Sequence, residues 1–514
     1  MHINHTSLKT KIVIIIGVVG FFLSNNLIAQ EIYPKREFRG VWITTVNNID
    51  WPSQPGLNSY RQQEEIINIL DQLESIGVNN VILQVRPSAD AFYAQSNEPW
   101  SYWLTGKLGK PPKPYYQPLK FIIDEAHKRG IDVHAWLNPF RAVQDRTKAR
   151  RYNNPIITEK PTWFVYYDKQ ILFNPGVPEV RQYINNIVAN LVRNYDLDGI
   201  HFDDYFYPYP VPGKYFNDYR TFKQYNPTQI PNIDDWRRHN VNIFVESVNR
   251  TIKSIKPYIK FGISPFAIWQ NSSQTPLGSE TAGLSSYKTL EADSRLWIKN
   301  GWVDYVAPQV YFHIGHPKAN FTCLVSWWGS NSFGRHVYVG MAAYKVGTDR
   351  KNWNQDQLTR QIEVSRLYNH TVHGQIYYNT SSFLKNPIGS TSKIKNNAYK
   401  YKALNPSMPW IHANTPAPPT NLVAIRSKNQ CKLTWQQKET STYVPIKGYV
   451  IYRFNKSDNI EINSPKNIIN IVYNQDFYVD RSVQRNKEYV YVITSIDRLH
   501  NESIPKEQVH VRIE

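Results

Sequence analysis

Two adjacent carboxylates, Asp203 and Asp204, stand where an apolar stretch gives way to aromatic residues, in the run Asp198-Gly199-Ile200-His201-Phe202-Asp203-Asp204-Tyr205-Phe206-Tyr207-Pro208. Two carboxylates a few ångströms apart cannot both ionise freely, so the pKa of one should rise and leave an acid beside a base. Cleavage of a glycosidic bond uses such a pair, because one group protonates the leaving oxygen and the other stabilises or attacks the anomeric carbon. A helix cap, a metal ligand or a salt bridge at a strand end would use the same residues without catalysis.

Further polar and aromatic side chains fall at the ends of other apolar stretches, and we expect them to gather around the two carboxylates. If these stretches are parallel strands of one barrel, their carboxyl ends meet at a single rim, where barrel enzymes bind substrate. The predicted substrate-binding residues are Arg86, Asp90, His134, Trp136, Asn138, Arg141, His201, Tyr205, Trp269, Gln309 and Tyr311. They would form a polar cup lined with aromatic rings.

The elements that must position these residues alternate between short β-branched runs and longer amphipathic stretches. The predicted strands are Phe38–Val46, Asn80–Pro87, Asp132–Phe140, Gly199–Phe206, Lys260–Trp269, Asp304–Phe312, Val337–Tyr344 and Gly374–Tyr378. Helical spacing is seen in Ser59–Ile76, Leu119–Arg129, Pro178–Tyr195, Asp234–Ile255, Leu290–Lys299 and Gln355–Tyr368. Eight strands followed by helical sequence predict an α/β fold of the (β/α)₈ TIM-barrel type over residues 36–404. The alternative, an open doubly wound sheet, would want a Gly-rich phosphate loop after its first strand, and none is present.

Three long segments follow predicted strands and should form the active face: residues 88–118, 141–177 and 270–289, all without regular periodicity. After the barrel, residues 405–419 are rich in proline and predict a semi-rigid linker. Residues 420–514 contain short alternating strands and predict a small all-β sandwich. The two cysteines, Cys323 and Cys431, fall in different predicted domains, so no disulfide framework is expected.

The N-terminal residues 1–29 are typical of a secretory signal peptide. Lys9 and Lys11 precede the apolar run Ile12–Leu23, and the small residue Ala29 follows. The run is short for a transmembrane helix, so we expect cleavage near Ala29 and no stable membrane span in the mature chain, with an uncleaved anchor as the alternative. The protein is therefore predicted to be exported, to the periplasm or cell envelope or beyond the cell.

The charge of the chain bears on its partners. The formal net charge is +19, and aromatic residues make up 14% of the sequence. An excess of positive charge favours encounter with anionic polymers, and aromatic faces can stack on sugar rings. We expect a polysaccharide partner, no nucleic acid and no cofactor. No metal site is expected either, although His201, Asp203 and Asp204 could ligate a divalent ion in a metal-dependent polysaccharide deacetylase.

Several motifs occur in order between about residues 36 and 385: Phe38-Arg39-Gly40-Val41-Trp42, Gln84-Val85-Arg86-Pro87, Ala135-Trp136-Leu137-Asn138-Pro139-Phe140-Arg141, Gly199-Ile200-His201-Phe202-Asp203-Asp204-Tyr205, Gly262-Ile263-Ser264-Pro265-Phe266 and Pro308-Gln309-Val310-Tyr311. In these the sequence resembles the glycosyl hydrolase-like 10 family. That resemblance implies a glycosidase-like barrel in the cell envelope and cleavage of peptidoglycan glycan strands. The tail, with Leu433-Thr434-Trp435 and Tyr489-Val490-Tyr491-Val492, resembles a fibronectin type III module.

Two more distant resemblances concern the roles of the carboxylates. The run from Asp198 to Asp203 is similar to the fourth-strand motif of α-amylase-like enzymes, which implies that Asp203 is the nucleophile, but the segment Phe261–Phe266 offers no Glu as acid. The same run resembles the Asp-x-x-Asp-x-Asp-x-Glu pattern of family 18 chitinases, with Tyr205 in place of the acid Glu.

The prediction is therefore a glycoside hydrolase that acts on an envelope glycan of 2-acetamido sugars. Asp203 would be the nucleophile, or would orient the acetamido group of the substrate, and Asp204 would be the general acid/base. The alternatives are a non-catalytic glycan-binding scaffold protein and the metal-dependent deacetylase.

Overall fold

The computed structural model describes residues 33–151, 154–427, 429–438 and 443–514. The chain divides into Met1–Pro34 and Lys35–Glu514, and the second unit carries the elements given below. The predicted signal peptide, residues 1–29, lies outside the described residues. Among the helices of the described part, none combines the length and the apolar character needed to cross a membrane.

Within the described residues, eight parallel strands close into a barrel in the order β1-β11-β10-β9-β8-β7-β3-β2. They are β1 (Phe38–Ile43), β2 (Asn80–Arg86), β3 (Asp132–Leu137), β7 (Gly199–Phe202), β8 (Lys260–Ile263), β9 (Tyr305–Val306), β10 (His336–Ala342) and β11 (Val372–Tyr378). Each matches a predicted strand, so the TIM-barrel prediction is confirmed. Most of these strands end earlier than predicted, because the apolar residues that follow them belong to loops packed on the barrel.

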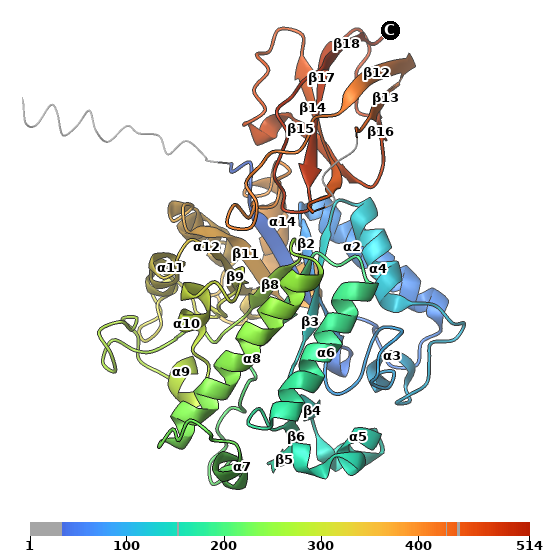
Figure 1. Ribbon diagram of the computed structural model, residues 1–514. Helices are drawn as coiled ribbons and strands as arrows, with labels where there is room; N and C mark the ends of the chain where they lie inside the picture. Colours follow the sequence, from blue (N-terminus) through green and yellow to red (C-terminus); the bar gives the residue numbers. More distant parts are fainter. Residues whose placement is uncertain (1–32, 152–153, 428, 439–442) are drawn as a thin grey trace, which may run out of the picture. The chain divides into compact units, whose positions relative to one another are not determined.

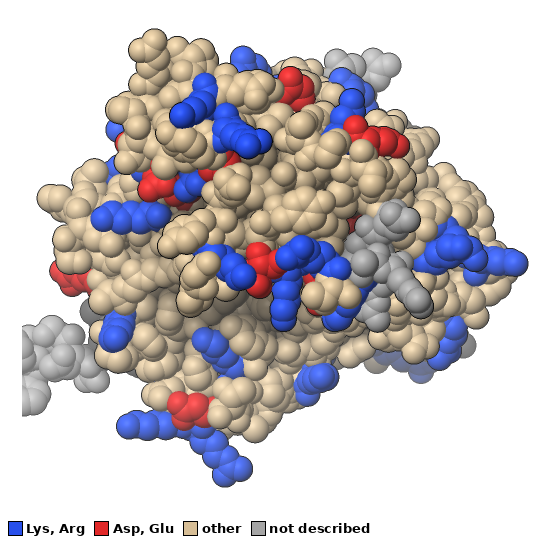
Figure 2. Space-filling model, turned by 90° about the horizontal axis from the view of Figure 1, so that it is seen from below, with Lys and Arg blue, Asp and Glu red and all other residues tan. Residues whose placement is uncertain are grey.

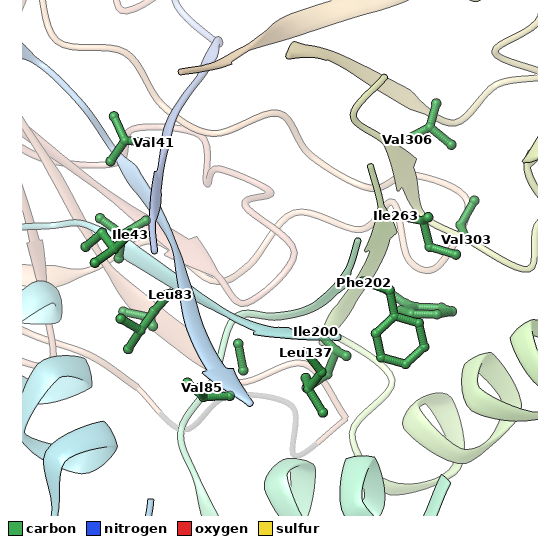
Figure 3. Close-up of a cluster of buried hydrophobic side chains, with 14 of the residues drawn as sticks. Val41, Ile43, Leu83, Val85, Leu137, Ile200, Phe202, Ile263, Val303 and Val306 are labelled. Carbon is green, nitrogen blue, oxygen red and sulfur yellow. The ribbon is translucent and has the colours of Figure 1, made fainter. Parts of the chain in front are cut away.

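Side-chain alternation separates the two faces of the barrel wall. Apolar side chains point outward from the strands toward the surrounding helices (Figure 3), among them Val41, Ile43, Leu83, Val85, Ile200, Phe202 and Ile263. The intervening residues point inward and form a separate aromatic-rich cluster of Phe38, Trp42, Ile82, Trp136, Tyr305, Ala307, Tyr338 and Ile376. The inward face of the wall leads into the loops at the carboxyl ends of the strands, which lie at the lower end of the barrel in Figure 1.

The larger helices follow the strands in the order expected for this fold (Figure 1). They are α2 (Ser59–Ile76), α4 (Pro118–Lys128), α6 (Pro178–Asn194), α8 (Ile233–Ile255), α10 (Ser294–Lys299), α11 (Phe321–Ser330) and α12 (Gln357–Leu367). Helix α2 shows why the boundaries were predictable: Asn58 caps its first turn through the Arg61 backbone N–H, and Gly77 ends it at φ 96°. Helix α11 was not predicted. Shorter helices lie in the loops: α3 (Tyr102–Thr105), α5 (Pro155–Glu159), α7 (Tyr219–Gln224), α9 (Ser286–Thr289), α13 (Thr380–Leu384) and α14 (Ser390–Asn396).

The loop after β3, predicted to be irregular, contains a small antiparallel sheet in the order β4-β6-β5. Its strands are β4 (Arg141–Val143), β5 (Phe164–Tyr167) and β6 (Gln170–Phe173). The sheet lies with α5 and α7 at the lower end of the barrel in Figure 1. This sheet holds Arg141 at the mouth of the barrel, close to the carboxyl end of β3.

The C-terminal residues form the expected all-β sandwich. Among the described residues, one sheet has the order β12-β13-β16 and the other β15-β14-β17-β18. The strands are β12 (Thr420–Ser427), β13 (Gln430–Gln436), β14 (Ile446–Asn455), β15 (Ile468–Tyr473), β16 (Phe477–Asp480), β17 (Glu488–Asp497) and β18 (Gln508–Arg512). The segment predicted as a linker is partly packed, since Met408 is fully buried against Val444 and Leu499.

Buried ion pairs join the sandwich to the amino ends of the barrel strands. The Lys447 ammonium donates to Asp132 at 2.5 Å and to Asp198 at 2.5 Å. His500 lies 2.9 Å from the second oxygen of Asp132. Lys447 and both of its carboxylate partners are almost inaccessible to solvent. The sandwich therefore shares a buried polar interface with the barrel at the end opposite to the carboxyl ends of the strands.

Candidate active site

Strand β7 delivers the two predicted catalytic residues to the mouth of the barrel. Ile200 and Phe202 point outward into the apolar shell, so His201 and Asp203 point inward by alternation. The strand ends at Phe202, and Asp203 is the first residue beyond it. Asp203 thus stands directly above the barrel interior that His201 occupies.

A cavity of about 230 Å³ opens at the carboxyl ends of the strands. Residues from at least six strand ends and loops line it: Trp42, Thr44, Val46, Asn47, Ile49, Gln84, Trp136, Arg141, Gln144, Asp203, Tyr205, Ser264, Gln309, Tyr311 and Tyr378. Among these lining residues of the described chain, Asp203 is the only carboxylate and Arg141 the only cation. The predicted residues Trp136, Arg141, Asp203, Tyr205, Gln309 and Tyr311 are therefore brought together here.

Hydrogen-bond donors fix the Asp203 carboxylate in the cavity floor. Asn138 donates its side-chain N–H to Oδ2 at 3.1 Å, and Gln309 donates to Oδ1 at 3.2 Å. The backbone N–H of Asp204 also donates to Oδ1, at 2.9 Å. Only 8% of the Asp203 surface is exposed. These three donors fix the orientation of a carboxyl group that faces the cavity.

Asp204 lies behind the cavity wall and does not line it. Its surface is 1% exposed, and the Tyr209 hydroxyl donates to its Oδ2. Burial raises the pKa of Asp204 well above the ordinary value, and the negative charge of Asp203 raises it further. The expected unequal protonation is thus favoured, but the expectation that both carboxylates face one cup is not met. The chain bends after β7, so consecutive side chains diverge.

His134 and His201 fill the barrel interior below the cavity. The Tyr305 hydroxyl lies 2.8 Å from His134 Nδ1 and 2.9 Å from His201 Nδ1. His201 Nε2 is also 3.2 Å from the Trp42 indole nitrogen. Burial lowers the pKa of His134 to about 3 and that of His201 well below its usual range. Both are neutral core histidines at physiological pH and do not reach the cavity.

A glycine makes room for this interior network. A Cβ at Gly262 would stand 1.9 Å from the Tyr305 ring. The glycine in the Gly262-Ile263-Ser264-Pro265-Phe266 motif therefore has a packing role, because it admits the ring that joins the two histidines.

Arg86 turns away from the cavity, contrary to expectation. The pairing of β2 with β3 shifts register between Gln84 and Arg86, so simple alternation fails there. Gln84 lines the cavity, whereas Arg86 forms two 2.7 Å hydrogen bonds with the Glu98 carboxylate and is fully buried.

Asp90, Trp269 and Asn138 also lie outside the cavity. Asp90 accepts from Ser101 at 2.6 Å, and burial raises its pKa to about 6. Trp269 stacks on Trp327 with ring centroids 5.9 Å apart. Asn138 acts indirectly through Asp203. These side chains shape the loops, and the substrate contacts predicted for them have no support from their positions.

Several lining residues were not among the predicted contacts. Trp42 and Gln84 follow the inward register of β1 and β2, and Ser264 and Tyr378 occur at strand ends, so alternation could have found them. By contrast, Asn47 and Ile49 come from the short 3₁₀ helix η2 (Val46–Asn48) and its C-cap after β1, and Gln144 comes from the loop after β4. No local pattern identifies these three, since only the fold of their loops brings them to the cavity.

No group of three or more metal-ligating side chains is found among the described residues. His201, which a metal site would share with the two aspartates, is held in the barrel interior by Tyr305 and Trp42. The structure therefore does not bring the three residues of the deacetylase alternative together.

The order and spacing of these residues match a known family. The sequence model of the glycosyl hydrolase-like 10 family aligns with residues 37–357, which include every barrel strand that reaches the Asp203 cavity except β11. The chain belongs to the glycosyl hydrolase-like 10 family. The predicted resemblance is confirmed, and with it the reaction class: the chain is a glycoside hydrolase.

Two similar proteins align with much of the chain. This chain is 38% identical over 492 residues to the glycosyl hydrolase YngK of Bacillus subtilis strain 168. The aligned region covers 95% of this chain and 96% of that protein. It is 38% identical over 352 residues to the glycosyl hydrolase DigH of Escherichia coli K12, over 64% of this chain and 79% of that protein. Among solved structures, the glycoside hydrolase domain of PgaB (BpsB) from Bordetella bronchiseptica aligns with a TM-score of 0.47 and 12% identity, over 70% of this chain and 98% of that one. The closed barrel described above establishes the fold independently of that weak likeness.

Proposed function

We propose that this protein hydrolyses peptidoglycan glycan strands, polymers of β-linked 2-acetamido sugars, in the cell envelope. The observation that carries the proposal is the Asp203 carboxylate. It is the only acid among the described residues lining the cavity, and it faces a space walled by Trp42, Trp136 and tyrosines. Export to the envelope rests on the signal-like sequence of residues 1–29.

Asp203 is proposed to act on the anomeric centre, as the nucleophile or as the group that orients the acetamido group of the substrate. Its amide donors, Asn138 and Gln309, hold the carboxylate without neutralising it. The sugar ring would lie against the aromatic wall. Tyr311 and Tyr378 stack within this wall, with ring centroids 5.9 Å apart.

Asp204 is proposed to hold the catalytic proton. Burial and the adjacent carboxylate keep its pKa raised, so it carries a proton where a free aspartate would have lost it. Because the Tyr209 hydroxyl covers it in this conformation, delivery to the leaving oxygen requires that the Tyr209 hydroxyl moves aside. This division leaves a proton on Asp204 beside Asp203, and glycoside hydrolysis uses such a pair of carboxyl groups in two different roles.

The decisive experiment is a turnover assay on peptide-free peptidoglycan strands, with products identified by mass spectrometry. Wild-type protein should generate new reducing ends, and Asp203→Asn should reduce kcat/KM by about 10³-fold or more while the fold is retained. A matched control, Asp349→Asn, removes an exposed acid from the loop after β10 and should change little. Unaltered turnover in Asp203→Asn would remove the mechanism, and binding without new reducing ends in the wild type would favour the glycan-binding scaffold.

A further inference from the structure

A proline-rich strap, residues 208–212, follows the two aspartates on the way from β7 to α7. In the run Tyr207-Pro208-Tyr209-Pro210-Val211-Pro212 every second residue is proline. Proline fixes φ and has no N–H, so the strap is stiff, and within it only Tyr209 and Val211 can donate from the backbone. The strap contains no helix or strand. Its position therefore depends on the side chains that it contacts.

One hydroxyl group holds the centre of the strap. Tyr167, in β5, accepts a hydrogen bond from the Val211 N–H at 2.7 Å and donates to the Tyr209 carbonyl oxygen at 3.2 Å. The Tyr167 side chain is buried, and its ring lies against Phe216, beyond the strap, with ring centroids 6.4 Å apart. Since a phenol hydroxyl can donate and accept at once, Tyr167 ties the strap to the β4-β6-β5 sheet.

The strap carries Tyr209, which covers Asp204. The Tyr209 hydroxyl donates to Asp204 Oδ2, and the ring packs against Tyr205 and Phe266 with centroid distances of 5.7 and 6.4 Å. Burial is the main reason why the pKa of Asp204 is raised. A displacement of the strap would therefore admit water to this carboxyl group and favour its ionised form.

The groups around Asp204 give that ionisation a definite sign. Within the described chain, the titratable groups beside it are Asp203, Tyr205, Tyr209 and Tyr311. Burial raises the pKa of all three tyrosines, so they stay neutral where Asp204 titrates. Figure 2 views the molecule from the end where β4–β6 and α7 lie, and Lys and Arg side chains predominate there over Asp and Glu. Water and a cationic surface would both lower the pKa of Asp204 once the strap opens.

We propose that Tyr167 is a positioning residue that holds the strap closed over Asp204 and so shields the catalytic acid from solvent. The inference rests on the proposed function, in which Asp204 holds the catalytic proton. It also gives the β4-β6-β5 sheet a role, because the sheet anchors a segment that lies 42 residues farther along the chain.

The test is the pH dependence of turnover on peptide-free strands. Tyr167→Phe removes the hydroxyl and keeps the ring against Phe216, so the strap should open more often. The basic limb of the kcat/KM profile, where the catalytic acid loses its proton, should then move to lower pH by about one unit. Tyr209→Phe removes a hydrogen bond that lowers the pKa of Asp204 but leaves the covering ring, so its limb should move to higher pH. The opposite signs separate opening of the strap from loss of one hydrogen bond.

Hydrogen exchange, measured by mass spectrometry on the whole protein, reports the strap directly. Exchange of the Val211 amide should be faster in Tyr167→Phe than in the wild type, because that amide loses its acceptor. Val211→Pro removes the same hydrogen bond from the strap side and should move the basic limb in the same direction as Tyr167→Phe. Tyr166→Phe is the matched control: Tyr166 is the neighbouring residue of β5 and is 56% exposed, so exchange and limb should stay at their wild-type values.

The outcomes distinguish this inference from the proposed function. If the wild type cleaves the strands but the basic limb of Tyr167→Phe stays in place or moves to higher pH, the inference is overturned and the proposed function stands. Unchanged exchange at Val211 in Tyr167→Phe would overturn it as well, since the strap would not need that hydroxyl. If the wild type cleaves no strand, the proposed function fails and the role of Tyr167 falls with it.

Discussion

Lys447 offers a severe test of the buried interface between the sandwich and the barrel. Its ammonium lies between Asp132 and Asp198, within 2.5 Å of an oxygen of each. Lys447→Met keeps the length and the apolar stem of the side chain but removes the charge. Two carboxylates would then lose their shared counter-ion in a region that solvent barely reaches.

The expected cost follows from that geometry. Removing one member of a buried ion pair costs about 3–5 kcal/mol, since the remaining charge stays buried without compensation. His500 and Lys260 continue to face Asp132, which argues for the lower half of that range. Urea unfolding, followed by tryptophan fluorescence, should show a clear fall in the midpoint. The midpoint is the proper measure because a chain of this size need not unfold in one step.

The pH dependence of this effect has a definite sign. Lys447 and His500 hold the pKa of Asp132 well below its ordinary value of 3.8 despite burial. A carboxylate with a lowered folded-state pKa contributes stability that is complete above its unfolded pKa of about 3.9 and is lost as pH falls further. The difference between wild type and Lys447→Met should therefore be full at pH 7 and shrink below about pH 4.

The control is Lys456→Met, in the same sandwich. Lys456 pairs with Glu488 at 2.6 Å, but its side chain is 68% exposed. An exposed pair is worth about 0–1 kcal/mol, so this midpoint should hardly move. If the two variants shift the midpoint equally, the buried network does not stabilise the protein in the way described.

Two other predictions concern the active site and the barrel interior. Tyr209→Phe removes a hydrogen bond that lowers the pKa of Asp204, so the pKa of Asp204 should rise further. The basic limb of the pH profile of kcat/KM, where the catalytic acid loses its proton, should then move to higher pH. If that limb does not move, Asp204 is not the catalytic acid. Gly262→Ala places a Cβ where the Tyr305 ring lies. This overpacking should lower the free energy of unfolding by about 1–3 kcal/mol or more, measured by thermal unfolding. A variant as stable as the wild type would show that the Tyr305 ring is not tightly confined.

The main features of the barrel could be predicted because local patterns repeat along the chain. All eight strands and six helices were predicted from apolar runs and helical spacing, and Asn58 and Gly77 mark the ends of α2. Helix α11 and the sheet β4-β6-β5 were missed. In that sheet β5 and β6 form a local hairpin, but β4 pairs with β6 across about thirty residues, and a single stretch of sequence carries no signal for that pairing.

The candidate site was predictable only in part, for a similar reason. Alternation along β7 placed Asp203 and His201 on the same side, but it could not say that one reaches the cavity while the other joins Tyr305 in the barrel interior. Arg86 was misplaced because a register shift breaks the alternation of β2.

The sequence alone determined the fold class, the strand that bears the adjacent carboxylates and the family, since each depends on residue order and periodicity. The tertiary structure decided which of the two carboxylates faces the cavity, which cation lines the cavity beside it and what the sandwich contacts. Those properties depend on burial and on charges from distant segments, and the energy of a charge in a protein is fixed by the groups around it, whatever their place in the chain.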